Sequence, residues 1–135
     1  MKNLFLSILA SLSIISYGQQ VTNINLAIEM IQTMDLDGGA TTEFWGYGLI
    51  QPNGNFTTSI PGPVLEINLG DSVYISAFND SPEDHTIHLH GLDVNQANDG
   101  VPTTSFAIDP DETGVYAFTA DHAGIFLYHC HVLTT

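Results

Sequence analysis

The sequence predicts an all-β protein, folded as a single Greek-key β-sandwich. Apolar and polar side chains alternate with a period of two rather than 3.6, which favours strands over helices. Candidate strands recur about every 8 to 12 residues between glycine- and proline-rich turns, as expected for a sandwich. The 135 residues are enough to bury one hydrophobic core and leave no room for a second large domain.

The N-terminal stretch differs from the rest of the chain. Met1, Lys2 and Asn3 precede an apolar run that continues to Tyr17. Residues 1–18 are therefore predicted to be a signal peptide, cleaved near Gly18, because the run is short for a membrane span. An N-terminal membrane anchor is the alternative interpretation. We expect an exported protein, periplasmic or secreted, whose domain covers residues 19–135 and has no stable membrane span after cleavage.

The first half of the domain is predicted to contain four strands. The opening strand shows the alternation at Ile24, Leu26 and Ile28, and the next strand carries Trp45 for the core. Turns are predicted where glycine follows aspartate or asparagine, since these pairs tolerate a positive φ. The predicted strands span residues 19–36, 41–47, 64–69 and 72–78.

The second half is predicted to add three strands, two of which carry histidines. Polar loops separate them at 79–84 and 92–104, and a turn is predicted at 109–114. The predicted strands span residues 86–90, 115–119 and 125–132.

Five of the six histidines and the only cysteine lie in two short segments of these strands. Side chains two residues apart on a strand share a face. His88 and His90 should therefore face the same way, and so should His129 and His131. These four could form an all-imidazole cluster.

The two remaining side chains have the opposite parity. Cys130 lies between His129 and His131, and His85 lies three residues before His88. On regular strands both would point away from the imidazole cluster. Cys130 and His85 could thus form a separate thiolate–imidazole site. Imidazole suits copper, zinc, iron and nickel, and adding a thiolate is typical of blue-copper sites.

The single cysteine and the charge distribution limit the functional classes. An exported chain with one cysteine cannot form an internal disulfide, so a metal ligand is the favoured interpretation of Cys130. Lys2 is the only basic residue, against 15 carboxylates. Nucleic-acid binding is disfavoured because phosphates are neutralised by Lys and Arg. The negative field favours metal ions or neutral molecules as partners over small anionic substrates, although a surface adapted to salt would look the same.

The two histidine segments, HTIHLHG at 85–91 and HCH at 129–131, resemble the copper-binding signature of multicopper oxidases, which are built from cupredoxin domains. The resemblance extends over residues 58–132. It includes Pro61-Gly62-Pro63, Gly70-Asp71-Ser72-Val73, Asn79, Asp99-Gly100-Val101-Pro102 and Gly124-x-x-x-Tyr128. A cupredoxin-like sandwich is the fold that this resemblance implies.

The resemblance also implies roles for the candidate ligands. His85 and Cys130 would hold a type 1 copper, which accepts electrons from a small reductant. His88 would bind the type 2 copper of a trinuclear cluster that reduces dioxygen. His90, His129 and His131 would bind the type 3 pair of that cluster. Asp99 is a further candidate, as a partner for a cluster histidine or water.

Departures from the family pattern imply a missing part. A further histidine and a methionine are expected soon after the HCH tripeptide, and the chain stops at Thr135. The trinuclear cluster needs four His-x-His pairs, whereas this chain has two. We therefore expect a truncated amino-terminal domain of a two-domain oxidase, inactive alone. A second cupredoxin domain or a neighbouring subunit would supply the other histidines.

Two other classes of function remain open. The first is a one-copper cupredoxin, an electron carrier or nitrite reductase-like protein without oxygen chemistry. The second is a protein with another metal, such as a zinc site or a cupin. A cupin would need a glutamate shortly after its His-x-His pair, and the residues after Gly91 contain none.

Overall fold

The computed structural model describes residues 18–35 and 37–132. Residues 1–17 of the predicted signal peptide lie outside this part. No helix within it is both long and apolar enough to cross a membrane. The expected all-β class is confirmed: the ordered elements are strands and a single turn of 3-10 helix (η1). They are β1 (Val21–Asp35), β2 (Thr41–Leu49), β3 (Ser72–Asn79), β4 (His88–His90), η1 (Gln96–Asn98), β5 (Thr113–Thr119) and β6 (Leu127–His129).

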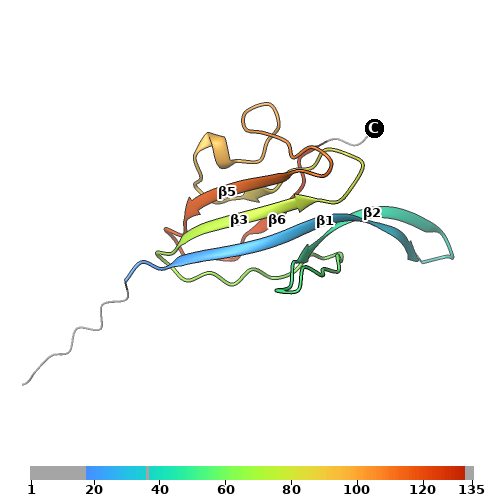
Figure 1. Cartoon of the computed structure of the whole chain (residues 1–135), viewed down its shortest axis with the longest axis horizontal. Coiled ribbons are helices and arrows are strands. Elements are labelled where there is room, and N and C mark those ends of the chain that lie inside the picture. Colours follow the sequence, from blue (N-terminus) through green and yellow to red (C-terminus); the bar gives the residue numbers. More distant parts are fainter. Residues whose placement is uncertain (1–17, 36, 133–135) are drawn as a thin grey trace, which may run out of the picture.

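The strands form two sheets (Figure 1). The larger sheet has the order β2-β1-β3-β5, and the smaller sheet pairs β4 with β6. All neighbouring strands are antiparallel except β1 and β3, which are parallel. The predicted β-sandwich thus contains one parallel pair among its antiparallel strands. β3 reverses direction relative to β2 but lies on the other side of β1, so it runs the same way as β1.

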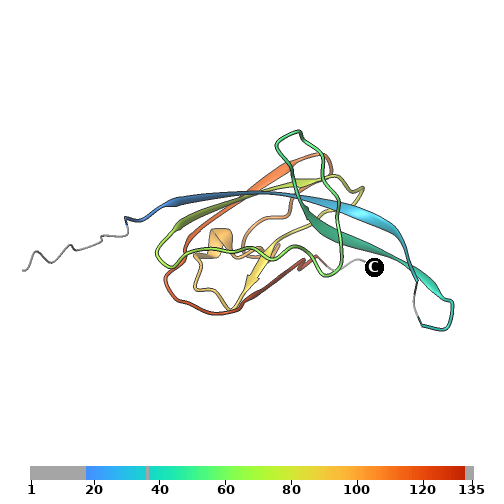
Figure 2. The ribbon, with the colours of Figure 1, turned by 90° about the horizontal axis from the view of Figure 1, so that it is seen from below.

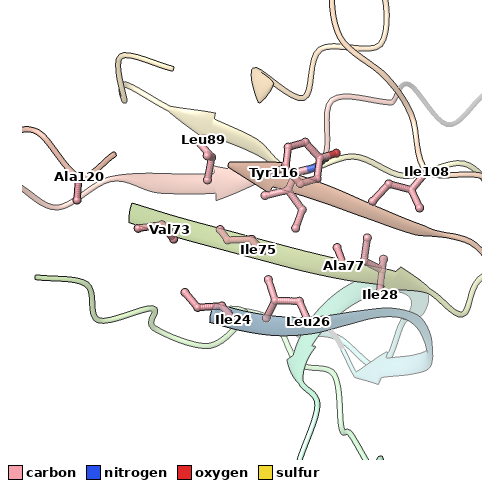
Figure 3. Packing of buried hydrophobic residues seen from close by; sticks show 11 residues of the cluster. Ile24, Leu26, Ile28, Val73, Ile75, Ala77, Leu89, Ile108, Tyr116 and Ala120 are labelled. Carbon is pink, nitrogen blue, oxygen red and sulfur yellow. Dashed lines mark hydrogen bonds between the residues drawn. The ribbon is translucent and has the colours of Figure 1, made fainter. Parts of the chain in front are cut away.

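The hydrophobic core lies between the two sheets (Figure 3). Leu26 and Ile28 of β1 and Ile75 of β3 come from the larger sheet and are almost completely buried. Leu89 of β4 meets them from the smaller sheet. Because Leu89 lies between His88 and His90, burying it in the core turns both histidines to the opposite face of β4.

The predicted strand at 64–69 is not a strand. Its alternation is real, since Leu65 and Ile67 pack against the core while Val64 is 84% exposed. The segment nevertheless has no strand pairing with the described residues. Side-chain alternation predicts which face is buried, but a strand also requires a neighbouring backbone to bond with.

An apolar groove of about 940 Å³ runs beside this unpaired segment. One wall is residues 61–69 and the other is residues 122–128, with Tyr47 and Phe118 also among its lining. Figure 2 shows this segment running across the molecule between the larger sheet and the chain that leads into β6. The groove therefore lies between the segment at 61–69 and the residues around β6.

The two histidine strands are shorter than predicted. β4 covers three residues, and so does β6. His85 lies outside β4, in an isolated bridge to Ile108 of the neighbouring loop. The backbone hydrogen bonds of that bridge are 3.1 Å from His85 N to Ile108 O and 2.7 Å in the reverse direction.

Candidate metal centre

The pairing of β4 with β6 creates the imidazole cluster. His88 lies directly opposite His129 across the two strands, and their ring centroids are 5.2 Å apart. One nitrogen of each of His88, His90 and His129 lies within 4.8 Å of the others. His131 joins from beyond the end of β6, with its ring 5.1 Å from that of His88. The structure thus brings together the four histidines that side-chain parity grouped into one cluster.

The hydrogen bonds of the cluster determine which nitrogens are free. His88 Nδ1 lies 2.6 Å from the main-chain carbonyl of Asp99, and His129 Nδ1 lies 2.9 Å from the carbonyl of Cys130. A carbonyl only accepts hydrogen bonds, so each Nδ1 carries the proton. The Nε2 lone pair of each ring is then available for a metal. His129 Nε2 lies 3.3 Å from His90 Nδ1 and therefore faces into the cluster.

The other two candidates meet on the buried side. His85 Nδ1 lies 3.4 Å from Cys130 Sγ. The backbone N–H groups of Thr86 and Val132 also donate to this sulfur, both at 3.4 Å. His85 is 2% exposed, and Cys130 is half-buried. The two side chains that parity placed together are therefore in close contact, although His85 lies outside the regular strand.

The surroundings of His85 favour its neutral form. Burial lowers the pKa of His85, because removing an imidazolium from water is unfavourable, and the nearby carboxylates of Glu83 and Asp84 partly oppose this shift. The ring packs against Trp45, at 5.7 Å between centroids. A neutral imidazole is the form that binds metals. His85 Nε2 is buried and has no hydrogen-bond partner in the described part of the chain.

The backbone leading into His85 is anchored by Asn79, a fully buried residue of the signature. Its side-chain amide donates to the carbonyls of Glu83 and Ile108, at 2.7 and 2.9 Å. Its amide oxygen accepts from Ser81. The Asn79 side chain thus fixes both the loop that precedes His85 and the segment at Ile108 that pairs with it.

Two tyrosines support the same segment. The Tyr47 hydroxyl donates to the carbonyl of Thr86 at 2.8 Å, and the Tyr116 hydroxyl accepts the N–H of Ile87 at 3.0 Å. Burial raises the pKa of Tyr116 to about 12. It also raises the pKa of Tyr47, with a smaller contribution from the charge of Cys130. Both hydroxyls therefore stay protonated, and both are structural supports.

The donor sets fit copper. Imidazoles suit copper among other metals, and a thiolate paired with imidazole is characteristic of copper electron-transfer sites. The buried contact between His85 and Cys130 provides such a pair, and the four-histidine cluster provides only imidazoles. Assignment of these six side chains as ligands remains a prediction.

Sequence reasoning missed several supporting residues and placed others correctly. Thr86 was given no role, and nothing in its local pattern distinguishes it from any strand threonine. Asp99 contacts His88, as expected of a supporting partner, but mainly through its carbonyl, with its carboxylate oxygen at 3.4 Å. The sixth histidine, His122, lies outside both donor groups and pairs with the adjacent Asp121 at 2.6 Å.

Comparisons with known proteins extend these observations. The multicopper oxidase family profile matches residues 32–135. A multicopper oxidase of Talaromyces pinophilus is 43% identical over 86 residues, covering 62% of this chain and 14% of that protein. Copper resistance protein A of Escherichia coli is 41% identical over 73 residues, covering 53% of this chain and 12% of that protein. The chain thus spans a small part of these relatives.

Solved structures show the same relationship. The blue copper oxidase of Nitrosomonas europaea superposes with a TM-score of 0.68 at 33% identity, over 84% of this chain and 33% of that one. The fold is accordingly a cupredoxin-like β-sandwich. With the profile match covering most of its length, this chain belongs to the multicopper oxidase family.

Proposed function

We propose that this chain is the copper-binding domain of an exported multicopper oxidase. In the whole protein, electrons from a reductant would pass through a type 1 centre at His85 and Cys130 to a trinuclear cluster. Dioxygen would be reduced there. The observation that carries this proposal is that two separate donor groups meet at consecutive residues of one HCH tripeptide. Cys130 contacts His85, while His129 and His131 join the imidazole cluster on the opposite face.

The roles of the side chains follow from their contacts. When bound, copper supplies the one-electron and oxygen chemistry, and the protein supplies ligand geometry and electrostatics. His85, which is buried, and Cys130, which is half-buried, would hold the type 1 copper. The carbonyl of Asp99 keeps the proton of His88 on Nδ1, which directs Nε2 towards the cluster.

The rest of the ligand set would come from outside the described residues. His90 and His131 are exposed, whereas His85 is buried. An exposed half-cluster suits completion by a second cupredoxin domain or a neighbouring subunit. The small share of the relatives that this chain covers is consistent with further polypeptide in the functional protein. Export through the predicted signal peptide is part of the same proposal.

The test uses the full-length protein that contains this chain. Cys130→Ser should remove the intense visible absorption of the copper-loaded protein and abolish its oxidase activity, because the thiolate is both ligand and link to the cluster. Steady-state oxygen uptake and absorption spectroscopy measure the two effects. Retained oxygen uptake in Cys130→Ser would contradict the proposal.

His122→Gln is the matched control. His122 is a histidine of the same domain that pairs with Asp121, packs against the ring of Phe126 and lies outside both donor groups. Its substitution should leave absorption and oxygen uptake unchanged. Metal analysis separates the alternative function: one tightly bound copper per chain and no oxygen uptake would identify a one-copper electron carrier instead.

A further inference from the structure

The N–H, the carbonyl and the hydroxyl of Thr86 all make hydrogen bonds in the region between the two donor groups. Its side chain is completely buried. Its N–H donates to Cys130 Sγ at 3.4 Å, and its carbonyl accepts the Tyr47 hydroxyl at 2.8 Å. Its Oγ1 accepts the backbone N–H of His131 at 2.8 Å and lies 3.9 Å from Cys130 Sγ. One residue therefore contacts both the sulfur and the histidine that follows it.

The direction of the hydroxyl proton follows from these contacts. The N–H of His131 brings its own hydrogen, so Thr86 Oγ1 receives it with a lone pair. The hydroxyl hydrogen is then free for another acceptor, and Cys130 Sγ is within reach. Because the N–H of Val132 also points at this sulfur, the sulfur has three potential donors around it.

We propose that Thr86 is a positioning residue. Its hydroxyl raises the reduction potential of a copper held by Cys130. This inference rests on the proposed function. Hydrogen bonds to the cysteine sulfur are one of the means by which a protein tunes such a centre. They withdraw electron density from the sulfur, which weakens its donation to Cu(II) and so favours Cu(I). The same hydroxyl fixes the backbone at His131, so it also holds the tripeptide between the two groups.

The test compares threonine variants in the copper-loaded full-length protein. Thr86→Val has nearly the same shape and keeps the backbone N–H, but it loses the hydroxyl. It should favour Cu(II) about tenfold, a fall of about 59 mV for a one-electron couple. It should also shift the thiolate-to-copper absorption band. Thr86→Ser, which keeps the hydroxyl, should restore both values towards those of the wild type.

Thr22→Val is the matched control. Thr22 also donates a side-chain hydrogen bond, to Asp71 at 2.8 Å, but it lies at the N-terminal end of β1. Its loss should leave the potential and the absorption band unchanged. A purely structural role for Thr86 would predict equal potentials for wild type and Thr86→Val, and that result would overturn the inference. So would a serine variant that behaves like valine.

A second measurement needs neither copper nor a substitution. In the metal-free wild-type protein, hydrogen exchange at the amide of His131 should be slowed by its bond to Thr86, even though the His131 side chain is exposed. Rapid exchange there would overturn the inference if Thr86→Val failed to fold. Absence of a thiolate-to-copper band in the wild type would instead refute the proposed function, and the exchange result would remain interpretable.

Discussion

At the scale of single residues, burial separates the two groups of candidate ligands. His85 is enclosed by Trp45 and the core, whereas His90 and His131 face solvent. His85 therefore already lies in a low-dielectric environment. The imidazole cluster needs additional cover before it can exclude water. The two groups therefore depend on the rest of the protein to different degrees.

Tyr116→Phe tests the support beneath the histidine segment. It removes the acceptor of the Ile87 N–H at a completely buried position. A buried donor without a partner costs about 1–3 kcal/mol, so the free energy of unfolding should fall by this amount. Urea denaturation followed by tryptophan fluorescence measures the change.

Tyr74→Phe is the control for this substitution. Tyr74 is 42% exposed on β3, and its hydroxyl makes no hydrogen bond within the described residues. Its change should alter stability by less than about 0.5 kcal/mol. Equal destabilisation by the two substitutions would show that the Tyr116 hydroxyl is not a structural support.

The grouping of the ligands was predictable because side-chain parity is a local property. His88 and His90 share a face whatever the partner strand is, and the same holds for His129 and His131. The contact of Asp99 with His88 through a backbone carbonyl was not predictable in this way. Backbone contacts depend on how a distant loop packs. They require no particular residue type, so the sequence does not reveal them.

At the scale of elements, the glycine at position 100 determines how closely the loop after η1 approaches β4. Gly100 has a φ of +71°, and a Cβ there would collide with the backbone of Ile87 and His88. Gly100→Ala should therefore reduce the free energy of unfolding by about 3 kcal/mol or more. The new Cβ would clash with a backbone that cannot move aside easily, and alanine is strained at this φ. The substitution should also weaken the bond between His88 and the Asp99 carbonyl. Chemical denaturation and the histidine NMR spectrum measure these effects.

Gly54→Ala separates the two causes. Gly54 also has a positive φ, +84°, but no atom lies within 4 Å of the position that its Cβ would occupy. It should cost only the conformational strain of about 1–2 kcal/mol. If Gly54→Ala is as harmful as Gly100→Ala, close packing against β4 is not the reason that position 100 is glycine.

Strand identity was predictable only where pairing was available. The alternation along β1 and β3 indicated strands, and both found partners within the larger sheet. The alternation at 64–69 is just as clear, and that segment has no strand partner among the described residues. Nor does alternation say on which side of β1 the chain returns, so the parallel pairing of β1 with β3 was beyond local prediction.

At the scale of the whole molecule, like charges dominate. Residues 19–135 contain 15 carboxylates and no lysine or arginine. Repulsion among them opposes the compact state and weakens as salt screens it. Raising the salt from about 0.01 to 0.15 M shortens the screening length from about 30 to 8 Å. The melting temperature should rise by about 4 °C, equivalent to about 1 kcal/mol. Calorimetry at constant pH measures this change.

A neutral osmolyte at matched osmolality is the control, because it alters water activity without screening charge. The melting temperature in the osmolyte should stay below that in salt. A melting temperature that is flat or falling with sodium chloride would show that the acidic surface does not destabilise the fold.

The apolar groove beside β6 also affects how the protein behaves in storage. Ile125 and Leu127 stand on one rim, highly exposed, and Val64 stands on the other, next to an unpaired extended backbone. An unpaired backbone beside exposed apolar side chains favours pairing with a strand of another molecule. Concentrated solutions of this chain should therefore aggregate and become turbid with time. Ile125→Lys, which places a charge on the rim, should slow this aggregation.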